Sequence, residues 1–471
     1  MASVVSTHHF LKTIDMNWLE RLTLAGYSCL VWAMQPLVRL KLRVRARKEP
    51  EYGVRVGTRF GRYDYAPEQG RVWVHAVSLG ETRAAQILIA ELRSLRPELK
   101  ILLTHGTASG WITGRDVVRP GDRQEWFPWD TRQATERFVR QFRPSIGLMM
   151  ETEVWPNMIH TCVRHGIPVI LVNARKSESS LAVARRRRWL ALPAYRALTA
   201  VLAQGAGDSA RLKALGARVI AETGNIKFDA RPAPNQLLQG KAWRRSSSRP
   251  VLMLASSRHG EEFAMLEALS SRRISGTMLR PLTCQVLIIP RHIQRVDELA
   301  AQIRNAGFSV SMRSQWCGAP QEADIWLGDT MGELTTYYAM SDVALLGGSY
   351  ERFGGQNLIE AAAAGCPVIM GPHTYNFSEA AQWALSAGAA RRASSMRDAV
   401  DQAFHWMARS DELTEARQRC LEFAGAHHGA ANVTAQQILS YAGTVAVSPA
   451  VQPMQVADQM DLLLGDVAPT S

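Results

Sequence analysis

Metal-binding and redox signatures are missing from this sequence. Its six cysteines are scattered, with no CxxC pair and no cysteine–histidine cluster at metal-ligand spacing: Cys29, Cys162, Cys284, Cys317, Cys366 and Cys420. This pattern is typical of a reducing compartment and gives no sign of a structural zinc site. A Walker motif, a GxGxxG after the first expected strand, a DxD-type pair and an internal repeat are also missing. We therefore expect neither a metal ion nor a cofactor.

Acidic residues are too few to balance the basic ones: 42 Asp and Glu stand against 55 Lys and Arg, which gives a formal net charge of +13. This excess predicts an anionic partner, which could be nucleic acid, an acidic membrane or a phosphorylated substrate. Basic residues that alternate with aromatic ones, as in a nucleic-acid-binding face, are not seen beyond residue 48. We therefore expect no nucleic-acid partner.

The segment Leu22–Val38 contains no charged residue and is followed at once by six basic ones: Arg39, Lys41, Arg43, Arg45, Arg47 and Lys48. This pairing predicts a membrane anchor whose basic flank keeps the rest of the chain in the cytoplasm. The apolar stretch is short and contains Pro36, so a tilted span and an interfacial helix both remain open. A buried N-terminal helix is the alternative.

The length of 471 residues and a hydrophobic content of 46% favour two domains, each with its own core. The polar segment 233–250, rich in Gln, Ser and Arg with a proline near each end, is the expected linker. The other expected segments are an extension at 1–17, the anchor with its basic flank at 18–48, a first domain at 49–232, a second domain at 251–445 and a disordered tail at 446–471.

Short apolar runs alternate with helical stretches in both halves of the chain, which is typical of parallel sheets covered by helices. The fold class expected is α/β, with two doubly wound, Rossmann-like domains facing a central cleft. The expected strands are Val72–Ala76, Ile101–Thr104, Ile146–Met150, Pro168–Asn173, Ala200–Gln204, Val251–Ala255, Gln285–Ile289, Ile325–Gly328, Val343–Gly347 and Pro367–Met370. Active-site residues are expected at the carboxyl ends of these strands.

Three acidic or basic clusters in the first half follow expected strands. Glu81 follows a glycine turn, where it could act as a base or could simply favour the positive end of a helix. Glu151 and Glu153 follow a strand directly, and one of the two is expected to be a structural partner. Lys227 could face the cleft or could pair with Asp229.

The second half carries features suited to binding a phosphate. Arg291 follows an expected strand, where its guanidinium can donate two parallel bonds to phosphate oxygens. Gly347-Gly348-Ser349 follows another strand, and a second glycine pair, at 354–355, precedes a helix that contains Glu360. Backbone amides in such loops bind anions without a metal, and Glu360 could accept bonds from a ribose.

Together these motifs resemble one family, the 3-deoxy-D-manno-octulosonic acid (Kdo) transferases of lipopolysaccharide synthesis. The resemblance extends from about Trp18 to the 420s and includes the segments HAVSLGETRAAQILI, METEVWPN, NARKSESS, TGNIKFD, LIIPRH, GDTMGEL, GGS and GPHTYNF. It implies a GT-B fold and an inverting glycosyltransferase that needs no metal. The implied donor is CMP-Kdo and the implied acceptor is the tetraacylated lipid A precursor, lipid IVA. It also implies that the enzyme acts at the cytoplasmic face of a bacterial inner membrane.

The resemblance also assigns roles to residues, with acceptor binding in the first domain and CMP-Kdo binding in the second. It implies that Glu81 is the general base and that Glu151 and Lys227 stabilise the transition state. Contacts to CMP are implied for the following residues: Pro290, Arg291, Met331, Gly332, Glu333, Asn357, Leu358, Ile359 and Glu360.

Two segments depart from the family pattern. The loop that commonly reads RGGHNPLE is FGGQNLIE here, and the common STHEGEE reads Ser256-Ser-Arg258-His259-Gly-Glu-Glu, which moves the histidine by one place. Two other functions remain as alternatives. One is another GT-B nucleotide-sugar enzyme, such as an epimerase, without a lipid acceptor. The other is a non-catalytic protein that binds an anionic membrane or nucleic acid.

Overall fold

The structure is a computed structural model that describes residues 16–275, 278–279, 282–426 and 428–446. It divides the chain into two compact units. The first unit runs to Thr223 and resumes at Asn432, and the second unit is Gly224–Ala431. Most of the expected extension at 1–17 and of the expected tail at 446–471 lies outside the described residues.

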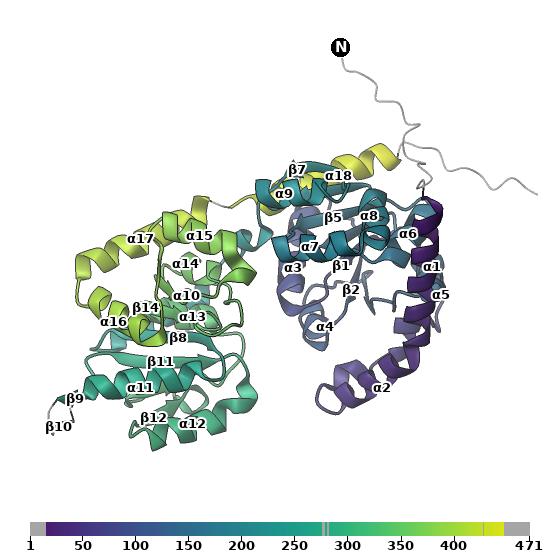
Figure 1. Ribbon diagram of the computed structural model, residues 1–471. Helices are drawn as coiled ribbons and strands as arrows, with labels where there is room; N and C mark the ends of the chain where they lie inside the picture. Colours follow the sequence, from purple (N-terminus) through teal and green to yellow (C-terminus); the bar gives the residue numbers. More distant parts are fainter. Residues whose placement is uncertain (1–15, 276–277, 280–281, 427, 447–471) are drawn as a thin grey trace, which may run out of the picture. The chain divides into compact units, whose positions relative to one another are not determined.

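The first unit contains a seven-stranded sheet in which all neighbouring strands are parallel. The strand order is β3 (Arg123–Trp126), β2 (Ile101–His105), β1 (Val72–His75), β4 (Ile146–Met150), β5 (Val169–Ala174), β6 (Ala200–Ala203) and β7 (Val219–Glu222). Helices cover both of its faces (Figure 1). The strand order reverses direction between β1 and β4, and ligands of such sheets bind at the carboxyl ends of the strands beside this point.

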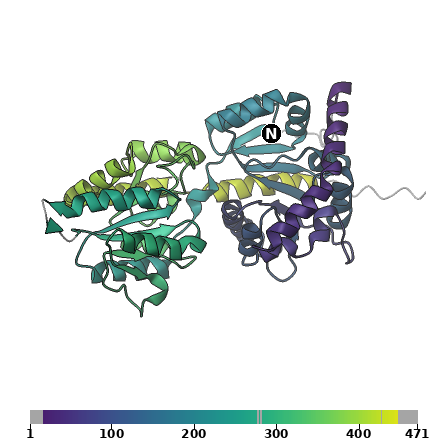
Figure 2. The ribbon, with the colours of Figure 1, turned by 60° about the horizontal axis from the view of Figure 1, so that its bottom comes forward.

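The helices of the first unit after the N-terminal pair are α3 (Leu79–Leu95), α4 (Ala108–Gly114), α5 (Arg132–Phe142), α6 (Pro156–Arg164), α7 (Glu178–Arg186), α8 (Arg188–Ala197) and α9 (Ala206–Lys213). Helix α18 (Ala430–Ala446) begins in the second unit and returns to the first (Figures 1 and 2). In the first unit the Asn432 amide donates to Glu91 of α3. The expected second domain, 251–445, is therefore wrong at its end, because α18 from Asn432 onward belongs to the first unit.

The second unit contains another all-parallel, seven-stranded sheet. Its order is β12 (Val310–Met312), β13 (Ile325–Leu327), β11 (Gln285–Pro290), β8 (Val251–Ser257), β14 (Val343–Leu346), β15 (Val368–Met370) and β16 (Ala390–Arg392). The reversal of strand order lies between β8 and β14. Two further strands of two residues each, β9 (Ile274–Ser275) and β10 (Met278–Leu279), pair antiparallel in a separate sheet.

The helices of the second unit are α10 (Pro234–Ser246), α11 (Glu261–Arg273), α12 (Val296–Asn305), α13 (Leu334–Met340), α14 (Ile359–Ala363), α15 (Ser378–Ser386), α16 (Met396–Met407) and α17 (Ser410–Ala426). All ten expected strands are found in the two sheets, with ends that differ by at most two residues. The other four strands of these two sheets were not expected, namely β3, β7, β12 and β16.

The expected linker at 233–250 is wrong. Most of it forms helix α10, which packs against α13 in the second unit. A side chain at Gly240 would approach the carbonyl oxygen of Thr336 to 2.3 Å, so this glycine permits the close helix contact. Trp243 is buried and its indole N–H donates to the carbonyl of Gly318 at 2.9 Å. Composition suggested a linker because α10 has few apolar residues, but glycine and one tryptophan make its contact face.

The apolar N-terminal stretch forms two helices, α1 (Trp18–Ala33) and α2 (Gln35–Ala46). The break falls at Met34, and Pro36 lies in the first turn of α2, where its missing N–H is tolerated. Among the described residues, no helix has the length and apolar character needed to cross a bilayer.

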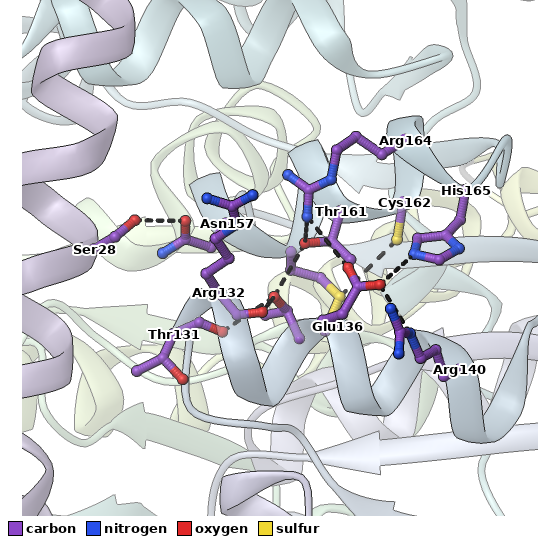
Figure 3. Close-up of polar contacts among 12 residues, drawn as sticks. Ser28, Thr131, Arg132, Glu136, Arg140, Asn157, Thr161, Cys162, Arg164 and His165 are labelled. Carbon is purple, nitrogen blue, oxygen red and sulfur yellow. Dashed lines mark hydrogen bonds and ion pairs between the residues drawn. The ribbon is translucent and has the colours of Figure 1, made fainter.

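Helix α1 contacts the first unit through polar groups on one face. Ser28 donates to Asn157 at the start of α6 at 2.8 Å (Figure 3). Tyr27 donates to the buried carboxylate of Asp130, also at 2.8 Å. Glu20 pairs with Arg196 of α8. Figure 3 also shows Glu136 of α5, which accepts from Arg140, Arg164 and His165 and so ties α5 to α6.

Candidate active site

Glu81 lies in the first turn of α3, directly beyond the carboxyl end of β1. One carboxylate oxygen, Oε2, accepts from the backbone amides of Val77 at 2.5 Å and Ser78 at 3.2 Å. The Ser78 hydroxyl accepts from the Glu81 amide in return, which makes a reciprocal capping box. Glu81 therefore does cap the start of α3, the structural role that the sequence left open. Within the described chain, no donor contacts the other oxygen, Oε1, so it remains able to accept a proton.

Two further carboxylates follow β4, the strand next to β1. Glu151 is almost fully buried, its backbone has a φ of 55°, and its side chain accepts from Arg175 at 2.7 Å. A left-handed conformation costs a non-glycine residue about 1 kcal/mol or more, and such strain is common at functional sites. Glu153 accepts from the indole of Trp155 at 2.7 Å and lies 3.8 Å from His75. Both carboxylates therefore have a partner within the protein, and which of them has only a structural role stays open.

Burial and mutual repulsion make ionisation of this carboxylate cluster unfavourable. Burial, followed by the charges of Glu151 and Glu153, raises the pKa of Glu81 from its usual 4.5 to about 7. Burial also raises the pKa of Glu153. Burial lowers the pKa of the neighbouring His75 to about 3, so this imidazole is neutral and brings no positive charge. A carboxylate with a pKa near 7 can take a proton from a hydroxyl group at neutral pH.

A cavity of about 400 Å³ in the first unit adjoins the chain segment that carries Glu153. It is lined by Thr152 and Val154, which flank Glu153, and by residues of α7, α8 and the segment before them. Its wall is mainly apolar, with Val183, Leu190 and Ala191 among its residues, while Lys176 and Arg187 add positive charge. The Lys176 ammonium donates to Tyr195 at 2.9 Å, and burial lowers its pKa. Such a site suits a ligand with both apolar and anionic parts.

In the second unit, the expected donor residues follow adjacent strands. Pro290 is the buried last residue of β11, and Arg291 next to it is exposed. Met331 and Gly332 follow β13 in an exposed loop. Glu333 accepts from Arg313 and Thr330. Although burial opposes its ionisation, these bonds lower the pKa of Glu333.

The segment 357–360 begins the short helix α14. Asn357 accepts from the amide of Ile359 at 3.1 Å, and Glu360 lies half-buried in the first turn. The side chains of Leu358 and Ile359 are buried in the core. Only their backbones can therefore reach a ligand, so a contact through these two side chains is excluded.

The glycine loop 347–349 differs from the phosphate cradle that the sequence suggested. The amides of Gly348 and Tyr350 already donate to the buried carboxylate of Glu261, at 2.8 and 3.1 Å. This internal carboxylate occupies the position that a phosphate would take. No local pattern indicates this contact, because Glu261 lies 87 residues earlier than Gly348.

Lys227 lies in the second unit, in the 3-10 helix Ile226–Asp229. Its ammonium is 5.8 Å from the ring centroid of Phe377. The sequence left open whether Lys227 pairs with Asp229. The Asp229 carboxylate instead accepts from the backbone amides of Gly429 and Ala431, at the start of α18. Glu81 and Glu151 thus gather in the first unit, while Lys227 and the donor residues belong to the second. Within the described residues, no group of His, Cys, Asp or Glu side chains is arranged to hold a metal ion.

Comparison with known proteins decides the family. A family model described as 3-deoxy-D-manno-octulosonic-acid transferase (kdotransferase) matches residues 54–230. The 3-deoxy-D-manno-octulosonic acid transferase of Bordetella pertussis is 42% identical over 431 residues, which cover 88% of this chain and 99% of the relative. The chain belongs to the Kdo transferase family. It is therefore a glycosyltransferase, and the resemblance inferred from the motifs is confirmed.

Solved structures show that this Kdo transferase has two parallel-sheet α/β domains resembling those of GT-B glycosyltransferases. A glycosyltransferase from Rickettsia africae aligns with a TM-score of 0.51 at 11% identity, covering 82% of this chain and 100% of that structure. The UDP-GlcNAc 2-epimerase of Neisseria meningitidis bound to UDP-GlcNAc aligns equally well, with a TM-score of 0.51 at 16% identity, covering 79% and 99%. Transferases and epimerases thus share this fold, so the fold does not decide between these activities. The sequence relatives decide for a transferase.

The raised pKa of Glu81 predicts a pH-dependent stability. Because the folded state binds this proton more tightly than the unfolded chain, Glu81 stabilises the fold fully below pH 4.5, and this contribution is lost as the pH rises to about 7. The free energy of unfolding of Glu81→Gln should therefore exceed that of the wild type by on the order of 1–3 kcal/mol between pH 5 and pH 8. Urea unfolding at several pH values measures this difference. Glu98→Gln, beyond the end of the same helix, is the control, and an equal pH profile for Glu81→Gln and wild type would contradict the prediction.

Proposed function

We propose that this Kdo transferase moves Kdo from CMP-Kdo to lipid IVA with inversion at the transferred carbon, and that Glu81 is the base. The observation that carries this proposal is a carboxylate with a pKa of about 7 at the reversal point of a parallel sheet. The adjoining cavity, apolar with two cationic side chains, supports an acceptor that is both acylated and phosphorylated.

In the proposed reaction, Glu81 removes the proton from an acceptor hydroxyl group as that oxygen forms a bond to the anomeric carbon of Kdo. The bond between this carbon and the phosphate oxygen breaks, and CMP leaves with the electron pair. Negative charge then grows on the phosphate, where the Arg291 guanidinium would stabilise it. The family motifs support Glu151 and Lys227 as stabilisers of the cationic sugar in the transition state. No step requires a metal ion.

The family motifs and the loop geometry support CMP binding at the carboxyl ends of β11, β13 and β14. Arg291 follows β11, the segment Met331–Glu333 follows β13, and the segment Asn357–Glu360 comes after β14. Glu333 is ionised and fixed by its bonds from Arg313 and Thr330, so it can accept hydrogen bonds from a nucleoside. Pro290 is buried, so only its backbone, next to the exposed Arg291, could contact the nucleotide.

Transfer assays test the assignment of the base. We expect Glu81→Gln to lose about 10²- to 10⁴-fold in kcat while its affinity for CMP stays unchanged, because glutamine keeps the helix cap but cannot accept the proton. CMP-Kdo is generated in situ, lipid IVA is the acceptor, EDTA is present, and mass spectrometry resolves the products. Glu98→Gln should behave as the wild type. Full activity of Glu81→Gln would exclude the mechanism, and no transfer by the wild type would exclude the proposed substrates.

We also propose that α1 and α2 attach the enzyme to the cytoplasmic face of an anionic membrane by lying in its interface. The face of α1 opposite to its polar contacts exposes apolar side chains, and α2 exposes both apolar and basic ones. The exposed apolar residues are Trp18, Leu22, Leu30, Trp32, Leu37, Leu40 and Val44, and the exposed basic ones include Lys41, Arg43, Arg45, Arg47 and Lys48. Together they provide an apolar face for lipid tails and cations for anionic headgroups.

Vesicle cosedimentation tests this attachment. We expect the Leu22→Glu and Leu30→Glu double variant to lose at least about tenfold in partitioning to vesicles of phosphatidylcholine and phosphatidylglycerol, because two charges would enter the apolar layer. Leu238→Glu in the second unit, where the leucine is 69% exposed, is the matched control. Wild-type binding should fall as salt rises and as phosphatidylglycerol is removed. Unchanged binding of the double variant would contradict the proposal.

A further inference from the structure

A group of cationic side chains lies beside the reversal point of the second sheet, at the exits of β8 and β11. Arg258 and His259 follow β8, while Arg291 and His292 follow the adjacent strand β11. The amide of Arg291 donates to the carbonyl of Ser257 at 3.0 Å, which holds the two strand exits together. On the other side of β8, a side chain at Gly347 would approach the carbonyl oxygen of Ala255 to 2.5 Å, so the loop after β14 also lies close. Ligands of doubly wound sheets bind at such points.

Arg295, in the 3-10 helix Ile293–Arg295, has its charge balanced within the protein. Its guanidinium donates to the buried carboxylate of Glu262 at 3.1 Å and lies 3.7 Å from Glu298. It also contacts the Nδ1 atom of His259 at 3.1 Å. This arginine therefore acts as a structural link between the two strand exits.

Arg258 is arranged differently. Its Nη1 contacts His292 Nε2 at 2.8 Å, and its guanidinium carbon is 5.4 Å from the ring centroid of Phe353. Its Nε–H is buried and has no hydrogen-bond partner, and no carboxylate of the described chain pairs with its guanidinium. Its backbone amide alone contacts Glu261. A partly buried cation with an unsatisfied donor is costly, and an anionic ligand would offset that cost.

His292 reinforces the positive character of this place. Partial burial, followed by the charges of Arg258, Arg291 and Arg295, lowers its pKa. The neutral imidazole can then accept a bond from Arg258 and so orient the guanidinium without competing for its charge. Two acidic side chains follow β8 closely, but their hydrogen bonds go elsewhere: Glu261 accepts backbone amides, and Oε1 of Glu262 accepts from Arg295 and Ser257. The charge of Arg258 is therefore left for a ligand.

The proposed donor carries two separate anionic groups, the phosphate of CMP and the carboxylate of the sugar acid. Arg291 is already assigned to the phosphate. We propose that Arg258, oriented by His292, binds the sugar carboxylate of the donor. This inference rests on the proposed function and adds a specificity-determining residue to it. A guanidinium donates two parallel bonds to a carboxylate, and a neutral nucleotide sugar would leave it unpaired, so the site selects for sugar acids.

The test measures binding of three probes to the full chain by calorimetry. They are CMP, a non-hydrolysable phosphonate analogue of CMP-Kdo, and the same analogue with its carboxylate reduced to a hydroxymethyl group. Wild type should bind the carboxylate analogue at least about tenfold more tightly than the alcohol, as charge-assisted bonds require. Arg258→Gln should abolish this preference by weakening the carboxylate analogue about 10- to 100-fold, with CMP and the alcohol unchanged.

Arg258→Lys, which keeps the charge but not the fork, should retain part of the preference, and Arg397→Gln on α16 is the matched control. Thermal unfolding identifies any variant that fails to fold, and Arg258→Lys then carries the test. Equal weakening of CMP and both analogues by Arg258→Gln would assign Arg258 to the phosphate and overturn the proposal. A preference that survives Arg258→Gln while wild type transfers Kdo would also overturn it. If wild type neither prefers the carboxylate analogue nor transfers Kdo, the proposed donor itself is wrong.

Discussion

The proposed chemistry depends on the enforced proximity of three glutamates at the reversal point of one parallel sheet. Glu81 comes from the exit of β1, and Glu151 and Glu153 come from the exit of the adjacent β4. Each strand is buried on both faces, so the loops that carry these carboxylates cannot move apart without disrupting the core. Burial and repulsion then raise the pKa of Glu81 into the range in which a carboxylate works as a base at neutral pH.

The same glutamate is both a helix cap and the proposed base, and these roles do not conflict. One oxygen accepts two backbone amides, which fixes the side chain in a single orientation, and the other oxygen is left for the acceptor hydroxyl. Such a fixed carboxylate needs little reorganisation when the proton moves. In the second unit, Glu261 is an example of the opposite case. Its oxygens are occupied by amides of the glycine loop, so it organises that loop.

The sequence predicted the central strands correctly but not the sheet edges. Strands such as β4 and β8 are buried on both faces and therefore appear as continuous apolar runs. The missed strands are short and partly polar, for example Arg123–Trp126, and all four lie at a sheet edge. Helix α10 was mistaken for a linker because its packing relies on Gly240 and Trp243 rather than on an apolar stripe. The motifs identified Glu81, but contacts between distant segments, such as Arg258 with His292, leave no local pattern in the sequence.

The central claim is that neighbouring carboxylates, together with burial, raise the pKa of Glu81. The most direct measurement is the ¹³C NMR titration of the Glu81 carboxyl carbon, assigned by its absence from Glu81→Gln, in wild type and in Glu153→Gln. Glutamine at position 153 keeps the bond from Trp155 but removes the charge. The account predicts a midpoint near pH 7 in the wild type and a lower midpoint in Glu153→Gln. A wild-type midpoint near 4.5, or one that does not move in the variant, would contradict it.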